Sequence, residues 1–120
     1  MTRTVDLVIA GGGSAALVAA AEALNRGRRV LVVLGCGDAR TGRCFRRRAC
    51  KAACAEHGDM TVMTNAEIVC VDGVNGVEAV VIRYARTGRL CAVNASAFMS
   101  CDGLPLPSQP ELVSRTDGLA

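Results

Sequence analysis

The residues best suited to chemistry in this chain are glycines close to its start. They follow the pattern Gly11-x-Gly13-x-x-Ala16. In such a pattern the first glycine lets the chain turn tightly, the second lets a diphosphate approach bare backbone, and a small third residue lets a helix pack closely on a strand. The N–H groups at the start of that helix, with its dipole, attract anions. The candidate binding residues are therefore Gly11, Gly12, Gly13, Ser14, Ala15 and Ala16.

The segments around this turn have the order strand, turn, helix, strand. Val5, Leu7, Val8, Ile9 and Ala10 form a short apolar run typical of a buried parallel strand, and residues 15–24 are rich in helix-forming residues. Gly27 is placed to end the helix, and residues 30–34 form a second apolar run that would lie parallel to the first. This order predicts a βαβ unit with the glycine turn at its ligand-binding edge. A βαβ unit without a nucleotide has the same order, so the alternative of a ligand-free unit stays open.

The rest of the chain predicts a helix, a third parallel strand and then a set of short antiparallel strands. Residues 41–57 have an apolar face at Phe45, Ala49, Ala52 and Ala53, opposite an arginine face, and Gly58 would end this helix. Strands are expected at 61–63, 66–72, 77–84, 90–94 and 97–101. The pair Asn75-Gly76 predicts a tight hairpin, because both residue types accept a positive φ.

The expected fold class is therefore α/β, a Rossmann-like three-layer domain with a parallel sheet and a β-meander crossover. Residues 1–103 would form this dinucleotide-binding domain. Residues 104–120 contain three prolines and are expected to be an irregular tail.

Length and composition limit the class of protein. A chain of 120 residues fits one domain and is small for a complete two-nucleotide oxidoreductase. No apolar run approaches the ~20 residues of a membrane span. The first residues also lack the regions of a secretory signal, so we expect a cytoplasmic protein.

Seven cysteines are scattered along the chain, without a CxxC pair. An odd number in a nucleotide-binding type of fold favours a reducing compartment and buried thiols over a disulfide framework. Two alternatives remain: a metal site built from Cys36, Cys44, Cys50 and Cys54, or a thiol sensor activated by neighbouring arginines. His57, the one histidine, is expected at the end of the basic helix, in a structural rather than a catalytic role.

Basic residues are concentrated just before and after the second predicted strand. Nine lie between Arg26 and Lys51, against the single acid Asp38, although the net charge of the whole chain is only +3. This block would either attract the phosphates of a nucleotide or form a solvated helix face. Nucleic-acid binding is not expected, because one tyrosine and two phenylalanines provide no stacking platform among the arginines.

Three groups of segments carry a resemblance to a known family. They are Asp6-Leu-Val-Ile-Ala-Gly-Gly-Gly-Ser-Ala-Ala at the start, Asn65-Ala-Glu-Ile-Val, Val74-Asn-Gly-Val-Glu-Ala-Val and Arg86-Thr-Gly-Arg in the meander, and Ala97-Phe-Met-Ser-Cys-Asp-Gly at the end. On these, residues 4–103 resemble the FAD/NAD(P)-binding domain of the two-dinucleotide-binding flavoproteins, which include glutathione reductase and thioredoxin reductase relatives. The resemblance implies that Asp102 and Gly103 touch the phosphate and ribityl region of the cofactor.

The same resemblance guides the choice of cofactor. FAD is the first choice, since in similar flavoproteins the FAD motif lies within the first few residues, and NAD(P) is the alternative. The acid that usually holds the ribose of FAD is replaced by Leu34, and of the basic residues typical of NADPH binding only Arg40 matches. The cofactor carries the chemistry in this family, so no catalytic residue is expected in this half. A partner subunit or a homo-oligomer would complete an enzyme, and a degenerate non-catalytic relative is the remaining reading.

Overall fold

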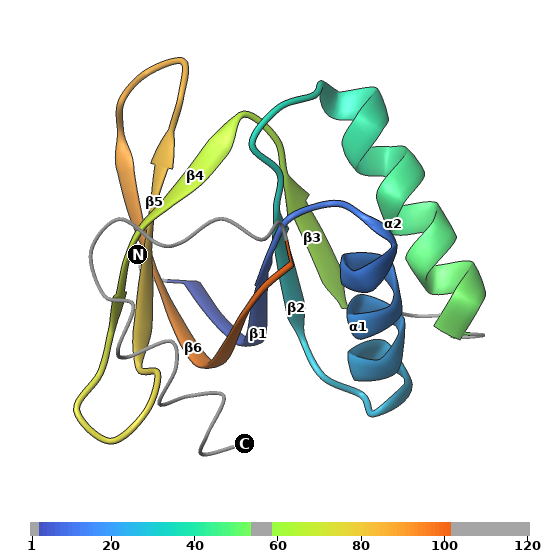
Figure 1. Cartoon of the computed structure of the whole chain (residues 1–120), viewed down its shortest axis with the longest axis horizontal. Coiled ribbons are helices and arrows are strands. Elements are labelled where there is room, and N and C mark those ends of the chain that lie inside the picture. Colours follow the sequence, from blue (N-terminus) through green and yellow to red (C-terminus); the bar gives the residue numbers. More distant parts are fainter. Residues whose placement is uncertain (1–2, 54–58, 102–120) are drawn as a thin grey trace.

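The computed structural model describes residues 3–53 and 59–101. These residues form one mixed sheet of six strands with two helices beside it (Figure 1). The strands are β1 (Arg3–Ala10), β2 (Val30–Val33), β3 (Met60–Met63), β4 (Ala66–Asp72), β5 (Ala79–Tyr84) and β6 (Leu90–Ser100). The helices are α1 (Ser14–Asn25), after β1, and α2 (Ala39–Ala53), after β2.

The sheet has the order β3-β2-β1-β6-β5-β4. β3, β2, β1 and β6 run parallel, whereas β6, β5 and β4 form an antiparallel meander. The predicted α/β class, with a parallel sheet and a β-meander, is therefore confirmed. The parallel pairing brings the carboxyl ends of β1, β2 and β3 to one edge, where ligands bind in open α/β sheets.

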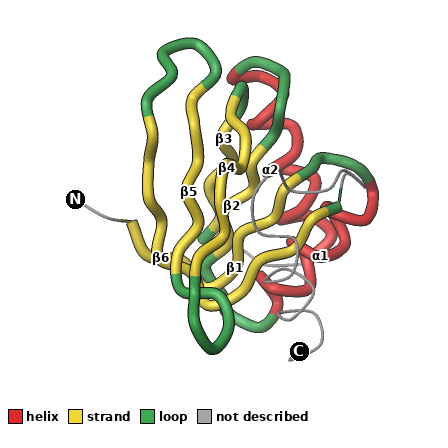
Figure 2. The backbone as a smooth tube through the Cα atoms, turned by 60° about the vertical axis from the view of Figure 1, so that its left-hand side comes forward, coloured by secondary structure: helices red, strands yellow, loops and turns green. Residues whose placement is uncertain are grey.

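Two apolar cores lie on opposite faces of the parallel strands. One core packs α1 and α2 onto the sheet through residues such as Ile9, Leu24 and Phe45. The other is enclosed by the meander and includes Val8, Ile82 and Phe98. Figure 2 shows the helices on one side of the strands and the β4–β5 arm on the other, which gives the three layers that the sequence predicts.

Helix α1 begins after the glycine turn and ends at a Schellman motif. Gly27 has φ +71, and its N–H donates to the carbonyl of Leu24 at 2.9 Å. The N–H of Arg28 donates to the carbonyl of Ala23 at 3.0 Å. This left-handed residue satisfies the last carbonyls of the helix, so the expected end at Gly27 is correct.

One expectation about the strands is wrong. Residues 90–94 and 97–101 are not separate strands, because β6 runs without a break from Leu90 to Ser100. Its first part pairs with β5 and its second part with β1. No glycine or proline stands between Asn94 and Ala97, so nothing in the backbone forces a turn there.

Two smaller expectations also differ from the structure. The β4–β5 connection is not a two-residue Asn75-Gly76 turn. It spans residues 73–78, with a positive φ at Gly76 but not at Asn75. In α2, Phe45, Ala49 and Ala53 are buried as expected, but Ala52 is exposed. Residues 54–58, where the predicted end of this helix falls, lie outside the described residues.

Candidate functional site

The glycine turn connects β1 to α1 at the carboxyl edge of the sheet. Gly11 has φ +115, a conformation that L side chains rarely adopt, and its N–H donates to the carbonyl of Val33 at 3.0 Å. This bond ties the turn to the end of β2 while the chain reverses toward the helix. Gly11 therefore has the role in the tight turn that its position predicts.

The start of α1 offers its backbone to the solvent. Gly13 is the N-cap residue, no side chain caps the helix, and its first turn contains no acid. A Cβ built on Gly13 meets no heavy atom within 4 Å, and residues 12–15 are exposed. The first N–H groups of a helix have no partner within the helix, and here the residues at the helix start are exposed and no side chain caps them. This is the geometry that a bound diphosphate requires.

Ala16 holds the other side of this turn. It is fully buried, with a relative exposure of 0%, in the core between the helices and the sheet. A larger side chain would push α1 away from the strands. The small residue at the third position of the pattern thus keeps the N-terminus of the helix at the sheet edge.

A cavity of about 340 Å³ opens beside the glycine turn. We call it the first cavity. Gly12 and Leu34 line it from the sheet edge, and Thr41, Cys44, Phe45 and Arg48 line it from α2. The cavity therefore combines an apolar wall with one hydroxyl group and one guanidinium group.

Leu34 directly follows β2, at the position where the resemblance leads us to expect a ribose-binding acid. Its side chain is buried, and its Cδ2 would lie 2.7 Å from a Cβ built on Gly12. Its N–H donates to the carbonyl of Met63 at 2.7 Å. Gly12 leaves the room that Leu34 fills, so at this position the site presents an apolar wall and no carboxylate.

The start of α2 contrasts with that of α1. The carboxylate of Asp38 accepts hydrogen bonds from the Thr41 N–H at 2.9 Å and from the Thr41 hydroxyl at 3.1 Å. These bonds, the backbone one first, lower the pKa of Asp38 below its ordinary value of 3.8. This helix end is therefore capped by its own sequence.

The predicted binding residues are only partly brought together. The turn of residues 11–16 forms one continuous element. Arg40 is exposed on α2 and does not line the first cavity, whereas Arg48 does. Thr41, Cys44, Phe45 and Arg48 follow the spacing of one helix face, a signal that could have added Arg48 to the candidates, and the predicted ligand contact of Arg40 stays a prediction. Asp102 and Gly103 lie outside the described residues.

Three of the four cysteines of the metal-site alternative lie in the described part of the chain. Cys36 and Cys44 are free and exposed, and Cys50 is half-buried. Within residues 3–53 and 59–101, no group of three or more His, Cys, Asp and Glu side chains is arranged to hold a metal ion. Cys54 and His57 lie outside those ranges.

The exposed face of α2 carries most of the basic block. Arg40, Arg43, Arg47 and Lys51 are exposed and form no ion pair within the described part of the chain. Arg46 instead donates to the carbonyl of Met60 at 3.1 Å. Neither helix of the described chain combines the length and the apolar character that a membrane crossing needs.

Comparison with known proteins finds matches in structure only. No protein-family model matches the chain, and no curated protein matches it. Thioredoxin reductase from Streptococcus pyogenes matches 91% of this chain with a TM-score of 0.64 and 20% identity. Thioredoxin reductase from Giardia duodenalis matches 91% with a TM-score of 0.65 and 19% identity.

A third similar structure is that of a flavin-dependent enzyme. The myxobacterial chondrochloren halogenase, a FAD-dependent halogenase, matches 84% of the chain with a TM-score of 0.62 and 13% identity. The chain has the Rossmann-like α/β fold of these enzymes. It spans about a third of their length, since it covers 34%, 34% and 38% of the three chains.

Proposed function

We propose that this chain binds a dinucleotide, with FAD as the first choice, and serves as the nucleotide-binding part of an oxidoreductase. One observation carries the proposal. The N-terminus of α1 is exposed and has no side-chain cap, and it lies at the carboxyl edge of parallel strands and beside the first cavity. In sheets of this type, that edge is where nucleotides bind.

Different residues would hold different parts of such a ligand. The N–H groups of the first turn of α1 would hold the diphosphate, with Gly13 leaving the space for it. Thr41 and Arg48 would face the nucleotide from α2. Bound FAD would supply the hydride and electron transfer, while the protein contributes position and electrostatics. Asp102 and Gly103 stay a prediction for the phosphate and ribityl contact.

Leu34 and Arg48 favour NAD(P) as the second candidate ligand. Without a carboxylate at the ribose position, and with a guanidinium in the cavity, this site has no charge that repels an added phosphate. Leu34 is equally compatible with a degenerate, non-catalytic relative that keeps the fold and acts through protein contacts. Binding measurements separate these possibilities.

The test is a titration of the purified full chain with FAD, NADH and NADPH, preceded by a visible absorption spectrum. We expect saturable binding of at least one ligand, and a flavin spectrum near one equivalent would identify FAD. Gly13→Ala places a methyl group where no protein atom lies within 4 Å, so it should fold normally and bind more weakly. Val18→Ala is the matched control, because Val18 is 64% exposed on α1. No binding of any of the three at millimolar concentration would overturn the proposal.

The wider context of this function is also proposed. The chain spans about a third of the structures that it matches, and the proposed partner is a further subunit or a second copy of the chain. We propose a cytoplasmic location and a nucleotide-binding domain of residues 1–103, both from the sequence. Co-purification and the mass of the native particle test the partner.

A further inference from the structure

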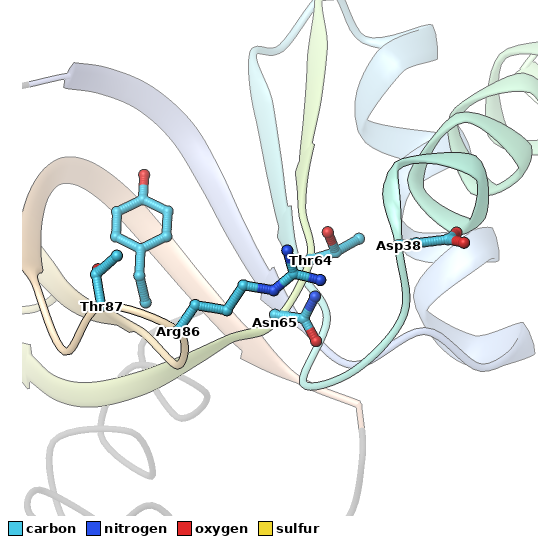
Figure 3. Close-up of a pocket in the computed structure, with 6 residues that line it drawn as sticks. Asp38, Thr64, Asn65, Arg86 and Thr87 are labelled. Atoms are coloured by element: carbon cyan, nitrogen blue, oxygen red, sulfur yellow. The ribbon is translucent and has the colours of Figure 1, made fainter.

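A second cavity, of about 450 Å³, lies on the other side of the β2–α2 loop. Tyr84, Arg86 and Thr87 line it from the end of β5 and the β5–β6 turn, and Thr64 and Asn65 line it from the β3–β4 turn. Asp38 stands at its edge (Figure 3). None of these residues lines the first cavity, so the two are separate sites.

Arg86 brings an unpaired charge into this cavity. Its neighbour Arg83 forms an ion pair with Glu67, and the other ion pairs of the described residues join Arg26 to Glu22 and Arg29 to Asp6. Arg86 takes part in none of them. Figure 3 shows its side chain extended from the β5–β6 turn toward Thr64 and Asn65. The guanidinium therefore has donors available for a ligand.

The carboxylate of Asp38 does not neutralise this arginine. Its oxygen accepts from the N–H and the hydroxyl of Thr41 within α2. In Figure 3 the carboxylate points away from Arg86 and toward the helix. The positive charge of Arg86 is thus the one that faces the interior of the second cavity.

Asn65 makes the wall of the cavity rigid. It has φ +53, an uncommon conformation for a residue other than glycine. Its side-chain amide donates to the carbonyl of Gly37 at 2.6 Å, and its own carbonyl accepts from the N–H of Ala85 at 2.8 Å. These bonds join the β2–α2 loop, the β3–β4 turn and the end of β5, so the three segments that line the cavity are held together before any ligand arrives.

We propose that the second cavity is a binding site for a small molecule that carries an oxyanion, a carboxylate or a phosphate. The planar guanidinium of Arg86 suits two parallel hydrogen bonds to either group. Figure 3 places the Thr64 side chain beside the guanidinium, where its hydroxyl group provides a further donor, and Tyr84 and Thr87 line the cavity farther along the β5–β6 hairpin. A cavity of this size has room for the rest of a metabolite. The site does not depend on nucleotide binding in the first cavity.

The experiment is a titration of the nitrogen-15-labelled full chain, followed by amide chemical shifts. Sodium phosphate and sodium acetate are the two probes, and sodium chloride at equal ionic strength is the salt control. We expect saturable shifts at Thr64, Asn65, Arg86 and Thr87 with at least one probe. The probe that binds more tightly distinguishes a phosphate ligand from a carboxylate ligand.

Variants of the hairpin decide whether Arg86 is responsible. Arg86→Gln should weaken binding by about tenfold or more, and Arg86→Lys should give an intermediate loss, because it keeps the charge and loses the fork. Arg89→Gln is the matched control, since Arg89 is exposed on the same turn and does not line the cavity. An unchanged spectrum of the free Arg86→Gln protein establishes that the variant folds.

Three results would overturn the proposal. The first is that neither probe gives saturable shifts. The second is that Arg89→Gln loses as much binding as Arg86→Gln, and the third is that the shifts are confined to the basic face of α2. The test uses no nucleotide, so its failure leaves the proposed cofactor binding intact, and a failed cofactor titration leaves this site intact.

Discussion

The two helices of this molecule start at the same edge of the sheet, but only one of them begins with a side-chain cap. Helix α1 follows β1 through a glycine turn and begins without a side-chain cap. Helix α2 follows β2 and begins at an aspartate whose carboxylate accepts from Thr41. Both positions have the dipole and the free N–H groups that attract anions. Only the first leaves them available for a ligand.

The helices also differ in what they present to the solvent. Helix α1 buries alanines and Leu24 and has no basic residue in its last turn. Helix α2 has a narrow buried face at Phe45, Ala49 and Ala53, and basic side chains elsewhere. We therefore expect α1 to offer its backbone N–H groups to an anion. Helix α2 would contribute a long-range positive field and one guanidinium group in the first cavity, that of Arg48.

The largest effect is expected when α1 receives a side-chain cap like that of α2. In Gly13→Asp the new carboxylate would accept from the first-turn N–H groups and repel a diphosphate. We expect a higher Tm of the ligand-free protein and a loss of nucleotide affinity of about 100-fold, which corresponds to roughly 3 kcal/mol. Gly13→Ser, which caps without charge, should lose less affinity. Calorimetric titration and thermal melts measure both effects, and unchanged affinity in Gly13→Asp would place the ligand elsewhere.

The next largest effects concern the glycines that precede each helix. Gly11 has φ +115 and Gly37 has φ +119, so Gly11→Ala and Gly37→Ala should each cost about 1–3 kcal/mol of stability. Only Gly11→Ala should reduce nucleotide affinity beyond what the lost stability explains. Urea unfolding with and without ligand separates the two quantities. An equal loss of affinity in both variants would contradict a ligand site at α1 alone.

A smaller effect distinguishes two arginines of α2. Arg48 lines the first cavity and Arg40 does not, so Arg48→Gln should weaken nucleotide binding by about fivefold and Arg40→Gln by less than about twofold. The remaining effect of Arg40 should disappear at high salt, because it acts through the long-range field. Affinities at low and high sodium chloride test this order, and a larger effect of Arg40 would reverse it.

The smallest effect is expected at the cap of α2. Asp38→Ala should lower the Tm by a few degrees without changing nucleotide affinity, whereas Asp38→Asn should keep most of the cap. Since the pKa of Asp38 is lowered in the folded state, its contribution is fully present above the ordinary value of 3.8. It is lost as the pH falls through the lower folded pKa.

Melts of the wild type and of Asp38→Asn across pH 2 to 7 check this sign, with a flatter curve expected for the variant. A stabilisation by Asp38 that grew toward acid pH would contradict the assigned hydrogen bonds.

Much of the fold follows from local sequence signals. The span of β4 is the one that the alternating pattern predicts, and the end of α1 is marked by Gly27. The turn at Gly11 follows from a pattern in which each residue has its own physical role. These features are determined by residues that are close together in the sequence, so they can be predicted from the sequence alone.

The errors arise where tertiary contacts decide. The continuity of β6 depends on two partners, β5 and β1, that are distant in sequence. That Arg48 lines the first cavity, which the sequence does not predict, depends on which face of α2 turns toward the glycine turn. The role of Asn65, which joins three segments, has no sequence signal beyond the tolerance of asparagine for a positive φ.

The unbroken β6 also joins the meander to the parallel strands through shared backbone hydrogen bonds. Val93 and Asn94 pair with β1 on one side and with β5 on the other. The meander can therefore not peel away from the parallel strands without breaking bonds made by residues that both layers share. The amides along this strand should therefore be among the last to exchange with solvent, later than those of the exposed glycine turn.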